Sequence, residues 1–327
     1  MTPSHIVSAL QKLISISQPT FLWGAPGVGK SQIVQQVAQK LHLELIDVRA
    51  VLLDPVDLRG LPHIGQDGDT VWCPPSFLPR SGKGILFLDE LNAAPPLVQA
   101  ACYQLILDRK LGEYALPDGW TIVAAGNRDS DRSSTHRMPS ALANRLVHLD
   151  FEPNLEDWTT WARSNGLDSR IISFLQLRPK LLHDFDPQKK ERAFPSPRSW
   201  EFSARILSAT PDRSEAVQII AGTVGKGAAT ELSGYLRIWE ELPNVDEMLA
   251  NPEQASIPTD PAVVCALCES LARRASRETM PELATLAKRM PTEFGVLLMR
   301  DAAFTDPSIV QTEAFEGWAV SNHQVLM

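Results

Sequence analysis

The chain has 327 residues, of which 44% are apolar and 21% charged, with a formal net charge of −8. This length accommodates about two domains of roughly 150 residues each. The apolar share is too high for a disordered protein. Four cysteines are too few for a disulfide framework and indicate a reducing compartment.

The sequence shows no sign of a membrane or secreted protein. Residues 1–13 lack the basic-then-apolar order of a secretion signal, and no apolar run approaches the roughly 20 residues of a membrane span. The acidic balance also argues against broad binding to a phosphate backbone. We therefore expect a cytoplasmic protein, with neither a membrane nor a nucleic acid as its partner.

The first half of the chain alternates apolar runs with helical patterns. A leading helix is predicted within residues 1–18, and two further helical patterns follow at 34–41 and 98–105. The predicted strands are Thr20–Trp23, Leu43–Val48, Ile85–Leu88, Thr121–Ala125 and Leu146–Asp150. Strands that alternate with helices predict an α/β fold, a mostly parallel sheet covered on both faces.

After residue 150 the strand signals fade and helical patterns dominate. The predicted helices are Leu155–Arg163, Arg170–Leu177, Ser199–Leu207 and Pro261–Arg274. A polar stretch at Phe185–Pro197 separates two of them, and Leu242–Asp260 reads as a surface linker. The second half is therefore predicted to be helical.

The segment after the first predicted strand matches the pattern G-x-x-x-x-G-K-[ST]. Its residues are Gly24, Ala25, Pro26, Gly27, Val28, Gly29, Lys30 and Ser31. Its glycines let backbone N–H groups turn toward phosphate oxygens, and the following helix presents its positive end. Lys30 would reach the β/γ-phosphates, and the Ser31 hydroxyl would bind Mg²⁺. Because strand and helix are both in place, the pattern predicts a phosphate-binding loop rather than a chance glycine-rich turn.

Two carboxylates, Asp89 and Glu90, follow the apolar run Ile85–Leu88. Ligands of parallel sheets gather at the carboxyl ends of the strands. Asp89 would hold Mg²⁺, and Glu90 would polarise the attacking water. A single acid at a strand end is common, but together with the phosphate loop this pair predicts nucleotide hydrolysis.

Two other strand ends carry polar candidates. Asn127 follows the strand Thr121–Ala125, where its amide could orient a water or contact a γ-phosphate; an asparagine that simply ends a strand is the alternative. Arg145 precedes the last predicted strand. The local sequence does not choose between it and three neighbouring arginines, which are Arg128, Arg132 and Arg137.

With these motifs in order, the chain resembles an AAA+ ATPase of the MoxR family. The matching segments are Gly24–Ser31 (Walker A), Asp54–Gly60, Ile85–Glu90 (Walker B), Asn92 with Ala94–Pro96, Ala124–Asn127 (sensor 1), Pro139–Arg145 (arginine finger) and Ser196–Arg198 (sensor 2). The family often has an arginine where this chain has Ala93.

The resemblance implies a fold and a set of roles. It implies a P-loop AAA+ core at 1–150, a helical lid with sensor 2 at 151–225, and a further helical extension at 226–327. Glu90, Asn127, Arg145 and Arg198 would be catalytic, with ATP bound by 24–31 and Asp89. Arg145 would act on a neighbouring subunit, so a ring is implied, usually a hexamer.

The resemblance also implies an activity and a partner. Relatives commonly act as chaperone-like machines that remodel or activate a protein partner, together with a von Willebrand factor A domain protein. The alternatives are a slowly hydrolysing switch or scaffold, and a DNA-directed AAA+ motor, which the acidic charge disfavours.

Two inserted segments fit the same family. Leu61–Arg80 and Lys110–Trp120 each predict a hairpin, the second with its turn at Pro117–Gly119. Their aromatic side chains could grip a client, although packing against the core is slightly favoured for each ring. These side chains are Trp72, Phe77, Tyr114 and Trp120.

The cysteines predict no site. Cys265 and Cys268 are spaced as CxxC, but both fall on an apolar helical stripe, and no second pair is spaced for zinc. Buried or partly buried thiols are therefore expected.

Overall fold

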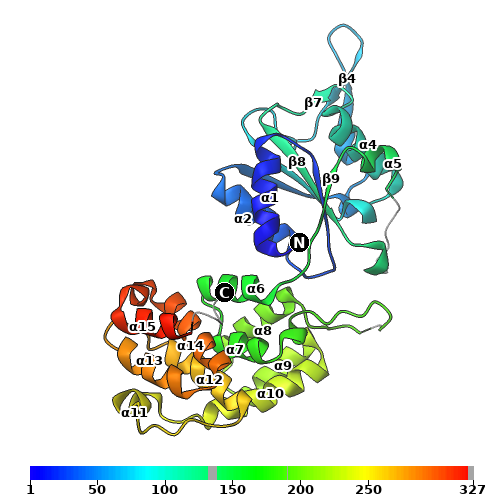
Figure 1. The fold of residues 1–327 in the computed structure, drawn as a ribbon. Coiled ribbons are helices and arrows are strands. Elements are labelled where there is room, and N and C mark those ends of the chain that lie inside the picture. Colours follow the sequence, from blue (N-terminus) through cyan, green and yellow to red (C-terminus); the bar gives the residue numbers. More distant parts are fainter. Residues whose placement is uncertain (132–137, 190, 323–327) are drawn as a thin grey trace. The chain divides into compact units, whose positions relative to one another are not determined.

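The computed structural model describes residues 1–131, 138–189 and 191–322. The chain divides into two compact units, drawn in Figure 1. The first comprises residues 1–158, 183–191 and 196–198, and the second comprises residues 159–182, 192–195 and 199–327. The unit boundary falls inside two helices, α6 (Leu155–Ser164) and α8 (Pro197–Ala209).

The first unit is built on a parallel sheet of five strands. Its strands are β1 (Thr20–Trp23), β2 (Glu44–Arg49), β5 (Gly84–Asp89), β8 (Trp120–Gly126) and β9 (Val147–Asp150). Their order across the sheet is β2-β5-β8-β1-β9, and all neighbours run parallel. This arrangement confirms the predicted α/β class, and the observed strand bounds differ from the predicted ones by at most one residue at either end.

Helices cover both faces of this sheet, as Figure 1 shows. On one face, α1 (Pro3–Ser15) and α2 (Lys30–Lys40) pack against side chains that include Ile85 and Phe87. On the other, α4 (Pro96–Asp108) packs against Leu86 and Leu88. Because side chains alternate along a strand, the continuous apolar run of β5 supplies both layers.

The remaining elements of the first unit are short. They are α3 (Pro55–Arg59), the hairpin β3 (Leu61–Ile64) and β4 (Thr70–Cys73), the hairpin β6 (Lys110–Leu111) and β7 (Tyr114–Ala115), and α5 (Ser140–Ala143). A capping box between Asp54 and Asp57 begins α3. Both predicted hairpins are therefore present.

The predicted turn of the second hairpin is wrong. Its two strands are joined at Gly112–Glu113, where Gly112 has φ +60°. The segment Pro117–Gly119 does turn, with Trp120 N donating to Pro117 O at 3.0 Å, but it leads into β8. Residues 117–119 do form a turn, as predicted, but this turn lies between β7 and β8 and does not join the two strands of the hairpin.

Most of the aromatic side chains on the inserted segments pack inward. Trp120 is fully buried, and its indole N–H donates to Ser81 O at 2.9 Å. Tyr114 and Phe77 are half-buried against the core, and the Tyr114 hydroxyl donates to Pro79 O at 2.6 Å. Trp72 alone among the four is exposed, at 37%. The packing alternative is confirmed for the other three.

The second unit is helical. Besides the rest of α6, its helices are α7 (Ser169–Leu177), α8 (Pro197–Ala209), α9 (Arg213–Val224), α10 (Lys226–Glu240), α11 (Val245–Ala250), α12 (Pro261–Ala272), α13 (Met280–Arg289), α14 (Thr292–Thr305) and α15 (Glu313–Ser321). The prediction of a surface linker at 242–260 is wrong in part, because this segment contains the helix α11, whose Val245 and Met248 are buried. Helices on both sides of residue 225 lie in this one unit, and the boundary predicted there stays a prediction.

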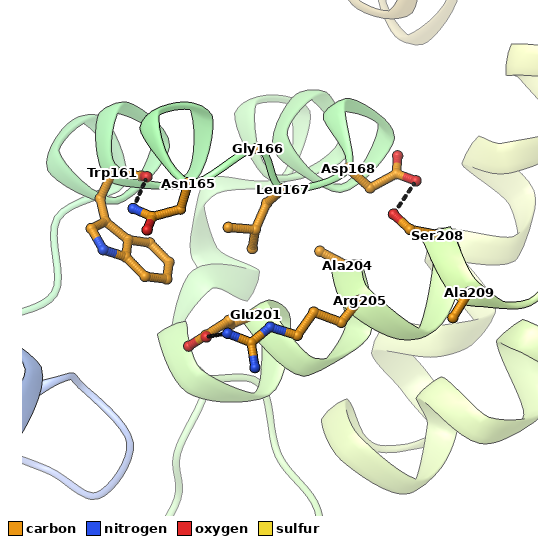
Figure 2. Close-up of a pocket in the computed structure, with 10 residues that line it drawn as sticks. All are labelled: Trp161, Asn165, Gly166, Leu167, Asp168, Glu201, Ala204, Arg205, Ser208 and Ala209. Atoms are coloured by element: carbon orange, nitrogen blue, oxygen red, sulfur yellow. Dashed lines mark hydrogen bonds and ion pairs between the residues drawn. The ribbon is translucent and has the colours of Figure 1, made fainter.

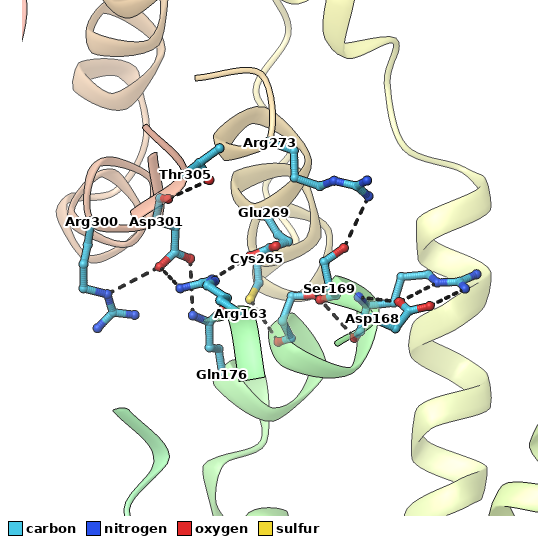
Figure 3. Close-up of polar contacts among 12 residues, drawn as sticks. Arg163, Asp168, Ser169, Gln176, Cys265, Glu269, Arg273, Arg300, Asp301 and Thr305 are labelled. Atoms are coloured by element: carbon cyan, nitrogen blue, oxygen red, sulfur yellow. Dashed lines mark hydrogen bonds and ion pairs between the residues drawn. The ribbon is translucent and has the colours of Figure 1, made fainter. Parts of the chain in front are cut away.

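A buried cluster of charges joins four helices of this unit. Figure 3 shows the Arg163 guanidinium between the carboxylates of Asp301 and Glu269, at 2.7 Å from each. Gln176 also donates to Asp301, at 3.2 Å. The side chain of Asp301 is only 1% exposed. Because these groups come from α6, α7, α12 and α14, their hydrogen bonds fix the relative placement of the helices.

A pocket of about 410 Å³ lies on the second unit, between α8 and the turn that joins α6 to α7 (Figure 2). Its charged lining groups are paired: Arg205 with Glu201, and Asp168 with Arg170. Elsewhere in the helical unit Cys265 and Cys268 are both buried, as expected. Among the described residues, no helix combines the length and apolarity that a membrane crossing requires.

Candidate functional site

The site lies at the carboxyl ends of the central strands of the first unit, where the predicted residues converge. Residues 24–29 form the loop after β1, and Lys30 begins α2. Gly27 and Gly29 have φ +78° and +104°, in the left-handed region that only glycine adopts at little cost. Glycine at positions 27 and 29 is therefore required by the backbone that the loop adopts.

Lys30 is a largely buried cation with uncharged hydrogen-bond partners. Its Nζ donates to the carbonyl oxygens of Gly24 and Ala25, at 2.6 and 3.1 Å. It also donates to Asn127 Oδ1 at 3.0 Å. Burial lowers the pKa of Lys30 to about 8, against the raising effect of Asp89. The ammonium group is thus held at the loop without neutralisation by an ion pair among the described residues.

Ser31 and Asp89 meet at the same place. Ser31 Oγ donates to Asp89 Oδ2 at 2.7 Å, although the two residues are 58 positions apart in the chain. A hydroxyl and a carboxylate are hard oxygen ligands of the kind that Mg²⁺ binds, with water and phosphate completing its shell. Among the described residues, no three or more His, Cys, Asp or Glu side chains form a metal-binding group. The oxygen pair fits magnesium held jointly with a phosphate.

Glu90 follows Asp89 in an uncommon backbone conformation. Its φ is +55°, and its N–H donates to Asp89 Oδ1 at 2.9 Å. A non-glycine residue in the left-handed region occurs preferentially at functional sites. The conformation ends β5 sharply and leaves Glu90 exposed, with its charge close enough to Lys30 to raise the pKa of that ammonium group.

Asn127, the sensor 1 candidate, is in direct contact with the turn that follows β5. Asn92, in the turn Leu91–Ala93 after β5, donates from Nδ2 to Asn127 O at 2.7 Å. Asn127 in turn accepts from Lys30. The sequence identified Asn92 only through a family resemblance; its contact with Asn127 depends on β5 and β8 being neighbours in the sheet.

The two arginine candidates that the structure describes, Arg128 and Arg145, differ in their surroundings. Arg128 is held within the first unit: its guanidinium donates to Phe151 O at 3.2 Å and to Glu152 Oε1 at 2.6 Å. Arg145 is exposed, and its side chain has no hydrogen bond or ion pair with the described residues. Arg132 and Arg137 lie outside the described residues. Of the two that are described, Arg145 is the one available to a neighbouring molecule.

Arg198, the sensor 2 candidate, lies close to the phosphate loop. Its backbone N–H donates to Gly27 O at 3.2 Å, and its charge lowers the pKa of Lys30. Ser196 lies above Gly27 so closely that a Cβ on Gly27 would be 2.7 Å from Ser196 Oγ. Residues 196–198 therefore belong to the first unit and cover one side of the loop.

These features define the P-loop AAA+ fold: a five-stranded parallel sheet with a phosphate loop after β1 and an acidic pair after β5. Residues 19–146 match the family model described as "AAA domain (dynein-related subfamily)". This segment of the chain is therefore similar to an AAA domain.

Curated relatives match over about half of the chain. The Holliday junction branch migration complex subunit RuvB of Acholeplasma laidlawii is 24% identical over 194 residues, covering 55% of this chain and 53% of its own length. Midasin of Giardia intestinalis is 27% identical over 174 residues, covering 50% of this chain and 4% of that protein. The chain thus spans about half of one relative's length and a small fraction of the other's.

Solved structures with similar folds include a putative ATPase from Cytophaga hutchinsonii, with 15% sequence identity and a TM-score of 0.37. That match covers 90% of this chain and 79% of the other. A mutant form of RuvB of Thermotoga maritima has 16% identity and a TM-score of 0.41, covering 81% of this chain and 79% of the other.

Proposed function

We propose that this chain is an ATPase that binds ATP with Mg²⁺ at residues 24–31 and hydrolyses it. The observation that carries the proposal is the convergence of Lys30, Ser31, Asp89 and Asn127 at one edge of the sheet. Lys30 and the loop N–H groups would bind the phosphates, and Ser31 with Asp89 would hold the metal ion. Bound Mg²⁺ would neutralise part of the negative charge on the phosphates.

Glu90 is proposed as the general base that activates water. A positioned base contributes about 10²–10⁴-fold to a rate. Glu90→Gln should therefore lower ATP turnover by that factor while ATP affinity stays near the parent value, because the amide preserves the shape. Measured turnover also separates an ATPase from a slowly hydrolysing switch or scaffold. Equal turnover of parent and variant would contradict the assigned role.

Arg145 is proposed as an arginine finger that acts on the nucleotide of a neighbouring subunit in a ring, with a hexamer as the expected state. Its side chain is exposed and has no partner among the described residues, which supports this role. Supplied fingers contribute about 10³–10⁵-fold to a rate. Arg145→Ala protein should be nearly inactive alone and should regain activity when mixed with Glu90→Gln protein. No rescue, under conditions in which mixed rings form, would contradict a shared site.

Arg198 is proposed as sensor 2. Its position beside Gly27 supports a contact with the β- or γ-phosphate, through which residues 196–198 would respond to hydrolysis. Arg198→Ala should therefore lower the affinity for ATP more than it lowers the affinity for ADP.

The output is proposed to act on a protein partner, as in the MoxR family, with a von Willebrand factor A domain protein as the candidate. Half of the exposed large apolar side chains among the described residues lie between residues 52 and 97. They are Leu52, Val56, Leu61, Ile64, Val71, Trp72 and Leu97. Four of them, Leu61, Ile64, Val71 and Trp72, lie on the paired strands β3 and β4, and exposed apolar side chains that lie together are typical of interaction surfaces.

The partner test uses the first hairpin, because Tyr114 on the second is half-buried. Leu61 and Ile64 are 67% and 82% exposed, and their replacement by Ser should leave basal ATPase activity intact. A pull-down with ATP-bound Glu90→Gln protein should recover a protein partner, and the hairpin variant should lose it. Val320→Ser, at a side chain 73% exposed on α15, is the matched control. Retention of the partner by the hairpin variant would contradict this surface.

A DNA-directed motor is the second candidate, because RuvB, named as a Holliday junction subunit, is among the relatives. The formal net charge of −8 opposes it. DNA binding that weakens steeply with salt, together with ATPase activity stimulated by DNA, would favour this candidate over the protein-directed one.

A further inference from the structure

Asn92 is a buried side chain held between the ends of two neighbouring strands. It is 2% exposed, and it lies in the turn that follows Asp89 and Glu90 at the end of β5. Its Nδ2 donates to Asn127 O at 2.7 Å, just beyond the end of β8. The side chain therefore links the segment that carries Glu90 to the residue that contacts Lys30.

The approach of Asn92 to β8 requires the glycine at position 126. A Cβ on Gly126 would be 2.1 Å from Asn92 Oδ1, far closer than any real contact. That Oδ1 is buried and accepts no hydrogen bond from the described residues. The amide is thus fixed by its one donated bond and by close packing, with the orientation set because an oxygen facing Asn127 O would be repelled.

The backbone of the turn is held separately, from α4. Gln99 Nε2 donates to Ala94 O at 2.9 Å and to Asn92 O at 3.3 Å, and Gln99 is itself buried. The Tyr103 hydroxyl donates to Gln99 Oε1. Because Gln99 secures the backbone of the turn, removal of the Asn92 side chain should release Asn127 without unravelling the turn.

We propose that Asn92 is a positioning residue: it holds Asn127 so that the Asn127 amide meets both Lys30 and the reacting phosphate. The inference rests on the proposed ATPase function. Asn92 touches neither nucleotide nor metal; it acts through Asn127. Loss of a partner that orients a functional group typically costs 10–100-fold in activity.

The test compares Asn92→Ala with the parent and with Asn165→Ala. In the control variant, the lost bond is again from an Asn Nδ2 to a carbonyl, that of Trp161 at 2.8 Å, but it lies in the second unit. Asn92→Ala should lower kcat about 10- to 100-fold and change ATP affinity less than threefold. Asn165→Ala should keep the parent kcat.

A split between kcat and ATP affinity separates positioning from mere structural support. A variant that only loosens the first unit should lose ATP affinity together with kcat, whereas a loss of positioning should lower kcat at a nearly unchanged ATP affinity. Asn92→Ser, which is smaller and still polar, provides the same measurements if the alanine variant fails to fold.

A parent-like kcat in a folded Asn92 variant would overturn the inference, and so would a loss of ATP affinity as large as the loss of kcat. These outcomes are distinct from a failure of the proposed function. If the parent itself does not hydrolyse ATP, the ATPase assignment fails. If the parent is active and Asn92→Ala matches it, only the positioning role is wrong.

Discussion

Lys30 in the first unit and Arg163 in the second are both largely buried cations, but their hydrogen-bond partners differ in kind. Lys30 donates to two carbonyl oxygens and an amide oxygen, all uncharged. Arg163 donates to two carboxylates. A buried charge without a counter-ion is costly, and an anionic ligand would relieve that cost at Lys30. At Arg163 the counter-ions are already part of the fold.

Burial and charge alone therefore do not mark a functional site. Both clusters contain a cation from one helix and acids from distant positions in the chain. What separates them is whether the cation is neutralised by the protein itself. Removing a partner of Arg163 should therefore affect stability, whereas removing Lys30 should affect ligand binding.

The largest effect on stability is expected for Asp301→Ala. The change leaves Arg163 buried with one carboxylate fewer, and breaking a buried ion pair from one side costs about 3–5 kcal/mol. Denaturant unfolding should show this loss, whereas ATP affinity of the folded protein should match the parent. Stability within about 1 kcal/mol of the parent would contradict a structural role for the cluster.

Lys30→Met should have a much smaller effect on stability. The methionine removes a buried charge, and the oxygens it leaves unpaired are worth about 1 kcal/mol each. The two terms oppose one another, so the unfolding free energy without nucleotide should change by about 1 kcal/mol or less. A loss of unfolding free energy as large as that of Asp301→Ala would show that the charge of Lys30 stabilises the fold, as that of Arg163 does.

ATP affinity should fall as pH rises through about 8. The folded pKa of Lys30 is lowered to about 8, so the ammonium is fully charged well below this pH and neutral well above it. A neutral amine does not attract phosphate, and bound nucleotide will itself raise the pKa and move the limb somewhat upward. Titrations with a non-hydrolysable ATP analogue from about pH 6.5 to 9.5 provide the measurement. Constant affinity across this range would contradict the role of Lys30.

The smallest effect concerns Glu269. Burial raises its pKa and Asp301 adds to this, against the lowering effect of Arg163. A carboxyl whose folded pKa is raised contributes stability that is present below its ordinary pKa and lost as pH rises through the folded value. Relative to Glu269→Gln, the parent should therefore lose stability as pH rises above about 4.5. Unfolding curves of both proteins at several pH values test the sign, and the opposite slope would refute it.

Much of the first unit could be predicted from the sequence because its signals are local. Short apolar runs define the strands, and the phosphate loop is a contiguous motif. The helix α11 escaped prediction because it has six residues and buries only Val245 and Met248, too few for a periodic pattern. The element types were thus accessible wherever the pattern was long enough.

The contacts that assemble the site were not accessible in the same way. The hydrogen bond between Asn92 and Asn127 spans 35 positions and exists because β5 and β8 are neighbours. The pair of Arg163 with Asp301 spans 138 positions and joins helices whose packing no local pattern reveals. Residue types at strand ends predicted which side chains matter, but tertiary structure decides how they meet.

The most direct test of the account is calorimetric titration of ATP and Mg²⁺ into the parent, Lys30→Met and Asp301→Asn, all folded and at neutral pH. We expect saturable binding to the parent and to Asp301→Asn with similar affinity. We also expect roughly hundredfold weaker binding to Lys30→Met, since a buried charge-assisted contact of about 3 kcal/mol is lost. Equal affinity of Lys30→Met and the parent, or no ATP binding by the parent, would contradict the account.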